Sequence, residues 1–356
     1  MNLLVERALQ KRDVLLRRIE EFAERIDSLD DTWRPVHIPN GKFPAMGAED
    51  GSYNAIEYRS ALLYGICAEV IVSDEGGLQI LRSGDVDILY PYRYVRDRLR
   101  IYMSIFELKT TLRALKRLSP SILLIDGSII SAIIRPLPFK ENLTPDMRAL
   151  VEKKYLSRIV RSVKSSEEVN VFSKELLDEL REDFGRMRGE IIAYLEFLEN
   201  LAVLREVLSD KYRDKIVSIS KTSRSTEMFN CNIPDIAILE KLTREEGYAR
   251  IPYIVKITKE RKRYFPVFSE FFRSLEFTVF YARLKERGQV LKFEVPRVID
   301  DDEIVELLSY LKTVSVDGYP YLLKRAHRDV IISNEVMEHI AKHIIGIHER
   351  KGREIL

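Results

Sequence analysis

Two aspartates with the same local context are the residues most able to carry out chemistry. Asp50 and Asp126 each close a predicted strand, over residues 43–50 and 121–126, and each begins the tripeptide Asp-Gly-Ser. The carboxyl ends of strands border the crevice where open α/β sheets place their ligands. The alternative is a β-turn, because Asp-Gly is a common turn dipeptide. For Asp126 that alternative is weaker, since its strand is continuously apolar, as in a strand buried on both faces, and an ionised group there requires a cation.

A third carboxylate, Glu107, falls on the helix predicted over residues 92–118. It lies off the stripe formed by Ile101, Ile105 and Leu112, so it could stand at the rim of the buried face. The order strand, two further strands, helix, strand, with carboxylates at those three places, is the layout of an RNase H-like nuclease core. Carboxylate oxygens suit Mg²⁺ or Mn²⁺, and two ions about 4 Å apart can activate water and stabilise the leaving oxygen of a phosphodiester. On spacing alone, a solvated helix Glu is the favoured alternative.

His327 stands out among the five histidines because it follows Lys324 and Arg325 and precedes Arg328. Like-charge neighbours disfavour the protonated form, and a neutral imidazole could ligate a metal or act as a base. The alternative is a surface histidine on a basic helix end.

Basic residues occur together with aromatic residues in several segments. Cations for phosphates and rings for base stacking are what single-strand binding needs, although a solvated surface accounts for at least half of these residues in so charged a chain. The segments are Lys221 with Arg224 after the strand predicted over 215–220; Lys256, Lys259, Arg261, Lys262 and Arg263 between Tyr253 and Tyr264-Phe265; and Arg93, Arg96, Arg98 and Arg100 interleaved with Tyr92, Tyr94 and Tyr102.

The elements that position these residues predict one mixed α/β domain over residues 1–356. Its core, 43–134 and 213–333, is interrupted by a helical insertion over 146–210. A helix over 1–30 precedes the core, and a helix or tail over 334–356 follows it. Within the insertion, apolar residues keep a 3-4 rhythm from Leu177 to Leu201, which predicts a long seam for an antiparallel helix or a second subunit. Gly185 and Gly189 weaken that helix.

Composition narrows the class of protein. The chain of 356 residues has 46% apolar residues, which excludes a disordered chain. Two distant cysteines exclude a disulfide framework, and no segment predicts a signal peptide or a membrane span, so we expect a soluble, cytoplasmic protein. The abundance of Glu, Lys and Arg is typical of heat-loving organisms. The 58 basic and 56 acidic residues nearly cancel, but their distribution predicts a basic channel leading to a small acidic pocket.

Four motifs follow one another along the chain. They are Glu49-Asp50-Gly51-Ser52-Tyr53, Leu124-Ile125-Asp126-Gly127-Ser128, Ile219-Ser220-Lys221-Thr222-Ser223-Arg224, and Gly318-Tyr319-Pro320 with Ala326-His327. In these motifs and their order, the sequence resembles the NurA family of archaeal nucleases over residues 43 to 333.

The resemblance implies an RNase H-like fold, a homodimer around a channel and a need for Mn²⁺ or a similar ion. It implies a single-strand endonuclease and a 5′→3′ exonuclease on single- and double-stranded DNA, working with the hexameric translocase HerA in double-strand-break resection. Asp50, Glu107 and Asp126 would be the catalytic carboxylates, with His327 as the family's histidine and Lys221 near the scissile phosphate. The sequence leaves open a non-catalytic DNA clamp or adaptor for a translocase, and an RNase H-like enzyme acting on RNA.

Overall fold

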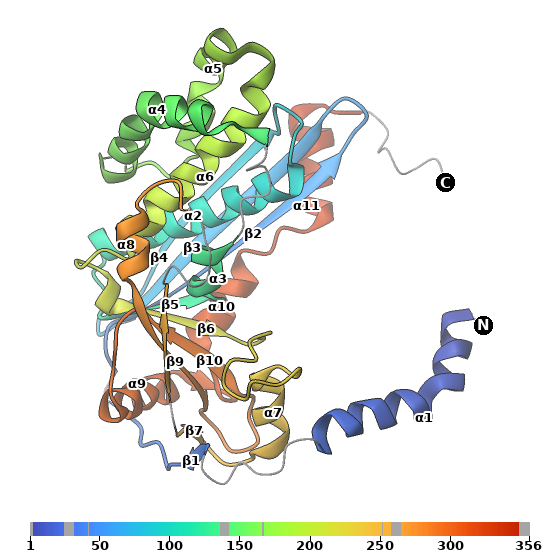
Figure 1. Ribbon diagram of the computed structural model, residues 1–356, viewed down its shortest axis with the longest axis vertical. Helices are drawn as coiled ribbons and strands as arrows, with labels where there is room; N and C mark the ends of the chain where they lie inside the picture. Colours follow the sequence, from blue (N-terminus) through green and yellow to red (C-terminus); the bar gives the residue numbers. More distant parts are fainter. Residues whose placement is uncertain are drawn as a thin grey trace.

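A computed structural model describes residues 3–24, 32–41, 43–135, 142–165, 167–250, 252–257 and 265–348, with the side chains of 19–24 left out. Its centre is a mixed sheet in the order β1-β7-β9-β10-β6-β5-β2-β3-β4, with β8 added on β9 (Figure 1). The strands are β1 (Trp33–Pro35), β2 (Met46–Glu57), β3 (Leu62–Asp74), β4 (Gly77–Ile88), β5 (Ile122–Asp126), β6 (Ile216–Ser220), β7 (Gly247–Ala249), β8 (Tyr253–Lys256), β9 (Glu276–Arg283) and β10 (Leu291–Val295), with β11 (Ser315–Val316) and β12 (Tyr319–Pro320) paired separately.

The parallel pairs of this sheet lie at its centre. β5 runs parallel to both β2 and β6, whereas the other pairs are antiparallel. Along β5, Leu123 and Ile125 pack into one hydrophobic core and Leu124 into the other. The strand is therefore buried on both faces, which its continuous apolar sequence predicts. The carboxyl ends of β5 and β6 meet at one edge of the sheet, as strand-end residues of a ligand site require.

Helices cover both faces of the sheet (Figure 1). α2 packs across β2, β3 and β4, α10 packs on β2 and β3 from the opposite face, and α4, α5 and α6 form a lobe against α2. The helices are α1 (Leu3–Glu24), α2 (Val95–Arg117), α3 (Ile129–Ile134), α4 (Pro145–Ser165), α5 (Leu177–Phe184), α6 (Arg188–Val207), α7 (Asp235–Leu242), α8 (Ser269–Ser274), α9 (Asp301–Thr313), α10 (Tyr321–Asp329) and α11 (Asn334–His339), followed by a π-helical segment, Ile340–Ile345. The predicted fold class, a mixed α/β sheet with flanking helices, is confirmed.

The helical seam predicted for the insertion is interrupted. The seam from Leu177 to Leu201 is divided at Gly185, whose φ of 51° ends α5 in a conformation that glycine adopts readily. A short 3₁₀ turn then redirects the chain into α6. The apolar rhythm identified the helical residues correctly but not the break. Near the end of the chain, α10 ends at Asp329 and α11 begins at Asn334, where Ser333 caps the new helix.

The described part of the chain contains no helix that is both long enough and apolar enough to cross a membrane. Cys67 and Cys231 are both free thiols.

Candidate metal centre

Asp50 lies within β2, not at its end, which corrects the sequence-based expectation. β2 continues to Glu57 because its antiparallel partner β3 supplies backbone hydrogen bonds along its whole length, so Asp50-Gly51-Ser52 is strand and not turn. On the other side, the parallel pairing with β5 ends at Glu49, opposite Ile125. Asp50 is thus the first residue of β2 beyond its parallel neighbour. The carboxylate stands at the open edge where β5 ends, which is the feature that the motif indicated.

His327 reaches Asp50 from α10 on the other side of the crevice. Its Nδ1 lies 2.6 Å from Asp50 Oδ2, and its side chain is 58% exposed whereas that of Asp50 is 11% exposed. β2 itself holds the end of α10 in place, because Ser52 Oγ donates to the Val330 carbonyl and Asn54 Nδ2 donates to the Ile332 carbonyl at 3.0 Å. The position of the imidazole is therefore fixed relative to the strand that carries Asp50.

The turn after β5 brings Asp126 into the same group. Gly127 has φ +104°, a conformation that favours glycine, and its N–H donates to the Ile219 carbonyl at 2.9 Å. Lys221 Nζ lies 3.4 Å from Asp126 Oδ2. Asp50, Asp126 and His327 each offer a ligand atom within 4.8 Å of the others, and we call these three residues the metal group. No second group of three such ligands occurs in the described ranges.

A buried carboxylate on β10 anchors this turn from behind. Glu294 is fully buried and accepts hydrogen bonds from Ser128 Oγ at 2.7 Å and from the Ile130 N–H at 3.0 Å. Lys292 Nζ donates to the same carboxylate at 3.0 Å. The bonds from Ser128 and Ile130 hold the chain just after Asp126-Gly127, so Glu294 fixes the direction in which the chain leaves β5. Nothing in the local sequence around Glu294 indicates this role.

Glu107 comes to the group from α2 and crosses β2 at Gly51. A Cβ atom on Gly51 would lie 2.5 Å from Glu107 Cγ and 2.7 Å from Oε1, so no other residue fits there without displacing the Glu107 side chain. The glycine of the first Asp-Gly-Ser motif is therefore required for a close approach and not for a turn. Glu107 is half-buried and lies close enough to Asp50 and Asp126 for their charges to raise its pKa, so it is not a solvated helix residue.

The acidic residues raise one another's pKa. Burial and then the charge of Asp50 raise the pKa of Glu107 to about 8, while Arg135 opposes the shift. Burial and then the charge of Asp126 raise the pKa of Asp50, while the hydrogen bond from His327 lowers it. Burial and then Glu107 raise the pKa of Glu49 well above its usual value. These carboxyl groups lie close together, and the protein supplies too few cations beside them to balance their negative charge.

The donor set fits a hard or borderline divalent cation. Two carboxylates and an imidazole suit Mn²⁺, and Mg²⁺ is compatible with the carboxylates. Glu49 Oε2 is buried without a hydrogen-bond partner in the described structure, so the acidic group has acceptor capacity that the protein does not use. A bound cation would supply the positive charge that this group lacks.

Glu49 and Tyr319 are members of the site that sequence reasoning missed. Glu49 lies beside Asp50 in the first motif, but the strand pattern over residues 43–50 is weak. It therefore did not indicate that Glu49 has a role in addition to that of Asp50. Tyr319 is 6% exposed, its hydroxyl has no partner among the described residues, and Lys221 Nζ lies 4.5 Å from its ring centroid. Burial and then Asp126 and Asp50 raise its pKa. The motif Gly318-Tyr319-Pro320 was the available signal.

The predicted DNA-contacting residues have different outcomes. Arg224 is exposed, and Lys256 is exposed but pairs with Glu276 at 2.6 Å. Phe265 is a correction: it is 5% exposed and stacks on Phe272 with ring centroids 5.1 Å apart, so it belongs to the core and cannot stack on a base. Lys259, Arg261 and Tyr264 lie outside the described residues.

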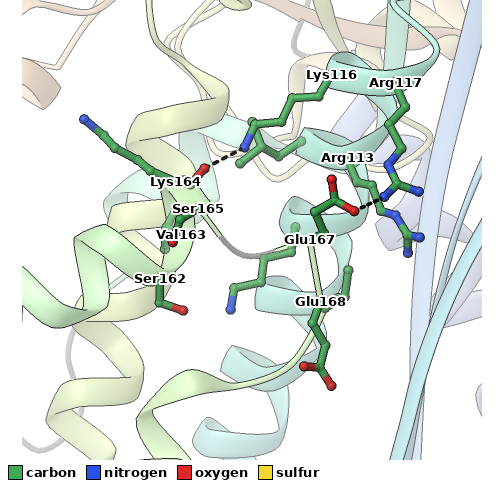
Figure 2. Close-up of a pocket in the computed structure, with 12 residues that line it drawn as sticks. Arg113, Lys116, Arg117, Ser162, Val163, Lys164, Ser165, Glu167 and Glu168 are labelled. Carbon is green, nitrogen blue, oxygen red and sulfur yellow. Dashed lines mark hydrogen bonds and ion pairs between the residues drawn. The ribbon is translucent and has the colours of Figure 1, made fainter.

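A second basic region lies on the helical lobe, between the ends of α2 and α4 (Figure 2). This cavity of about 330 Å³ has Arg113, Lys116 and Arg117 on one wall. Lys116 Nζ donates to the Lys164 carbonyl at 3.2 Å, and Arg117 pairs with Glu167. Lys116 and Arg117 thus have acceptors within the same pocket, whereas Arg113 Nε is buried without a hydrogen-bond partner in the described structure. The carboxylates that could hold a metal lie elsewhere.

Comparison with curated proteins places the chain in a family. The model of the NurA domain matches residues 44–332. A protein of Sulfurisphaera tokodaii named DNA double-strand break repair nuclease NurA is 30% identical, with 95% of each chain covered. A protein of Methanocaldococcus jannaschii named probable DNA double-strand break repair nuclease NurA is 28% identical, with 99% of this chain and 92% of that protein covered.

Solved structures show the same fold. The NurA nuclease from Sulfolobus solfataricus superimposes with a TM-score of 0.73 at 22% identity, covering 97% of this chain and 96% of that one. A NurA structure bound to dAMP and manganese gives a TM-score of 0.65 at 17% identity, with 98% of both chains covered. The family match spans both Asp-Gly-Ser motifs and the histidine of α10, and the chain belongs to the NurA family.

Proposed function

We propose that this protein is a divalent-metal-dependent DNA nuclease that acts in the repair of double-strand breaks. The observation that carries the proposal is the convergence of Asp50, Asp126 and His327 from three separate elements within 4.8 Å, with the half-buried Glu107 close enough to feel the charges of both aspartates. The names of the curated relatives, DNA double-strand break repair nucleases, support the substrate and the process.

Each side chain has a role that follows from its position. Asp50, Asp126 and His327 would hold the metal, with Glu107 completing an acidic group able to take a second ion. Bound Mn²⁺ or Mg²⁺ supplies Lewis acidity toward a phosphodiester and lowers the pKa of bound water. Lys221, whose ammonium lies between Asp126 and the ring of Tyr319, is placed to stabilise negative charge that develops on the phosphate.

The finer activity follows the family resemblance. It is single-strand endonuclease and 5′→3′ exonuclease activity on single- and double-stranded DNA, by a homodimer that works with a HerA-type translocase. Exposed apolar side chains on α1, including Leu9, Leu15 and Leu16, support a further protein contact. That contact would give the protein the second subunit or the translocase that the activity requires.

The test is cleavage of 5′- and 3′-labelled single- and double-stranded DNA with Mn²⁺, comparing wild type with Asp126→Asn. We expect the variant to be about 1,000-fold slower or worse, because the metal's charge stabilisation is worth several kcal/mol and each 1.36 kcal/mol is a factor of ten. Asp302→Asn, an exposed carboxylate in the first turn of α9, is the matched control and should cleave normally.

Two outcomes would overturn the proposal. Cleavage by Asp126→Asn at the wild-type rate would remove the metal group from catalysis. DNA binding without cleavage by the wild-type protein, and no rise in melting temperature with Mn²⁺, would favour a non-catalytic clamp. When a labelled RNA strand is added to this assay, faster cleavage of RNA than of DNA would correct the substrate.

A further inference from the structure

A second cavity lies against the Asp126-Gly127-Ser128 turn, on the opposite face of the sheet from His327. Its volume is about 430 Å³, and Ser128 is one of its lining residues. Side chains alternate between faces along a strand. On β6, Ile219 faces the core that includes α10, so Ser220 and its register partner Lys292 face the other way, into this cavity. The cavity therefore lies next to the metal group, past the carboxyl ends of β5 and β6.

The lining of this cavity is rich in hydrogen-bonding groups that suit phosphate and sugar oxygens. Hydroxyls and two cations dominate it, and a single carboxylate, that of Glu227, is present. Hydroxyls can donate or accept, so they suit both phosphate and deoxyribose. The polar lining residues are Ser128, Ser131, Ser220, Thr222, Ser223, Arg224, Ser225, Thr226, Glu227 and Lys292.

Lys292 is the strongest polar feature of the cavity. It is 8% exposed, and its ammonium donates a hydrogen bond to Glu294 at 3.0 Å, while the charge of Glu227 also raises its pKa. An ammonium group has three donors, so this buried cation keeps donors for a further acceptor. Glu294 meanwhile divides its oxygens between Lys292 and the turn after Asp126. A ligand on Lys292 would thus contact the network that supports the metal ligand.

The remaining lining is apolar and aromatic. Ile130 and Ile134 of α3, Val255 of β8 and the ring of Tyr253 border the cavity. A flat ring can lie against such side chains, and base–aromatic contacts are sequence-tolerant because every base has a π-face. One cavity thus presents oxygen-binding groups beside a surface that suits a nucleobase.

We propose that this cavity binds one nucleotide unit of the DNA strand, next to the phosphodiester at the metal group. Its phosphate is held by Lys292 and Arg224, its sugar by the hydroxyls, and its base by Tyr253 with Ile130 and Ile134. This assignment rests on the proposed nuclease function, because it requires the DNA strand to run from the metal group past Ser128 into the cavity.

The first measurement is calorimetric binding of dAMP, deoxyadenosine and inorganic phosphate to the full-length wild-type protein without metal. We expect dAMP to bind at least about tenfold more tightly than either part alone, since both the phosphate and the base contribute. Equal binding of inorganic phosphate and dAMP would overturn the assignment in favour of a simple anion site, and no binding of any of the three would remove it.

The second measurement fills the cavity. Ser131 is exposed on α3 and lines the cavity, so Ser131→Trp should occlude it and weaken dAMP binding about tenfold or more. Ser274→Trp, on an exposed serine of α8 outside the cavity, is the matched control and should bind as wild type. Unchanged dAMP affinity in Ser131→Trp would overturn the assignment.

Arg224→Gln keeps the test independent of folding, because Arg224 is exposed and its replacement removes no packing. It should weaken dAMP about tenfold and leave deoxyadenosine unaffected, as expected for a phosphate contact. Equal effects on both ligands would place the phosphate elsewhere and contradict the assignment. All these readouts are made without metal or cleavage, so they are separable from the failure of the nuclease proposal in the Asp126→Asn assay.

Discussion

The helical lobe and the edge of the sheet both bury carboxylates, but they treat them in opposite ways. In the lobe, fully buried Glu196 receives a forked pair of bonds from Arg98, at 2.8 and 2.7 Å, and Glu199 receives Lys109 at 2.8 Å. At the edge of the sheet, Glu49 and Asp50 are also buried, yet no buried arginine or lysine in the described structure pairs with either of them.

This difference separates a structural carboxylate from a functional one. A buried charge is tolerated when a partner and further hydrogen bonds compensate for lost hydration. In the lobe that compensation comes from protein side chains, Arg98 and Lys109, and the resulting ion pairs hold α2 against α6. The edge of the sheet leaves compensation to a ligand, and the raised pKa values of Asp50 and Glu107 are the result. Perturbed carboxyls at the end of parallel strands indicate a functional site for this physical reason.

The largest effect should follow from breaking a lobe pair. Arg98→Met leaves the Glu196 carboxylate buried without its cation, so we expect unfolding to require about 3–5 kcal/mol less free energy. Asp50→Asn in the metal-free protein should cost nothing or stabilise it, since it removes one of several crowded like charges. Urea denaturation of both variants measures this. Restoring stability by adding Glu196→Gln to Arg98→Met is the control, and equal destabilisation by Arg98→Met and Asp50→Asn would refute the contrast.

The pH dependence of metal-free stability should come from the edge of the sheet. Glu107 has a pKa of about 8 in the folded protein against about 4.3 in an unfolded chain, so the folded state binds more protons between these values. Stability therefore falls as pH rises from about 4.5 to about 8, by about 4 kcal/mol. Chemical denaturation across this range, without metal, should show the fall in wild type. It should be smaller in Glu107→Gln and unchanged in Glu270→Gln, an exposed control on α8.

A bound metal should offset the repulsion among the carboxylates at the edge of the sheet, and it should have no such effect on the helical lobe. Mn²⁺ at 100 times its dissociation constant stabilises a folded protein by about 2.7 kcal/mol. We expect that gain in wild type and its loss in Asp126→Asn, whereas a lobe variant such as Lys109→Met should lose stability but still gain from Mn²⁺. Thermal unfolding with and without Mn²⁺ distinguishes the two regions, and an equal Mn²⁺ response in wild type and Asp126→Asn would count against the metal group.

What the sequence revealed about these regions depends on how local the signal is. Asp126 was predictable because five consecutive residues make a buried strand and the next two make its turn. Asp50 was identified as a site residue but placed at a strand end, since pairing with β3 is decided by residues some twenty positions away.

Arg98 shows the limit of local patterns. With Tyr102 it belongs to an Arg- and Tyr-rich segment that predicts a nucleic-acid surface, yet both side chains are buried against Glu196, which lies 98 positions from Arg98. The prediction that Phe265 contacts DNA is wrong for a similar reason, because its ring stacks on Phe272 of α8. Residue types indicate that a cation or a ring needs a partner, whereas only the fold decides whether that partner is a core residue or a ligand.

Glu294 combines features of both regions and gives the finest test. It is buried and paired with Lys292, as in the lobe, yet its other bonds hold the turn that carries Asp126. Glu294→Gln keeps the shape but weakens these contacts, so we expect Mn²⁺ to bind about 10- to 100-fold more weakly, as for other residues that support metal ligands. Mn²⁺ titration in the folded variant measures this, with Glu199→Gln as the lobe counterpart. If Glu294→Gln lost stability but bound Mn²⁺ with wild-type affinity, Glu294 would belong with the structural pairs of the lobe, and the functional region would end at the ligands themselves.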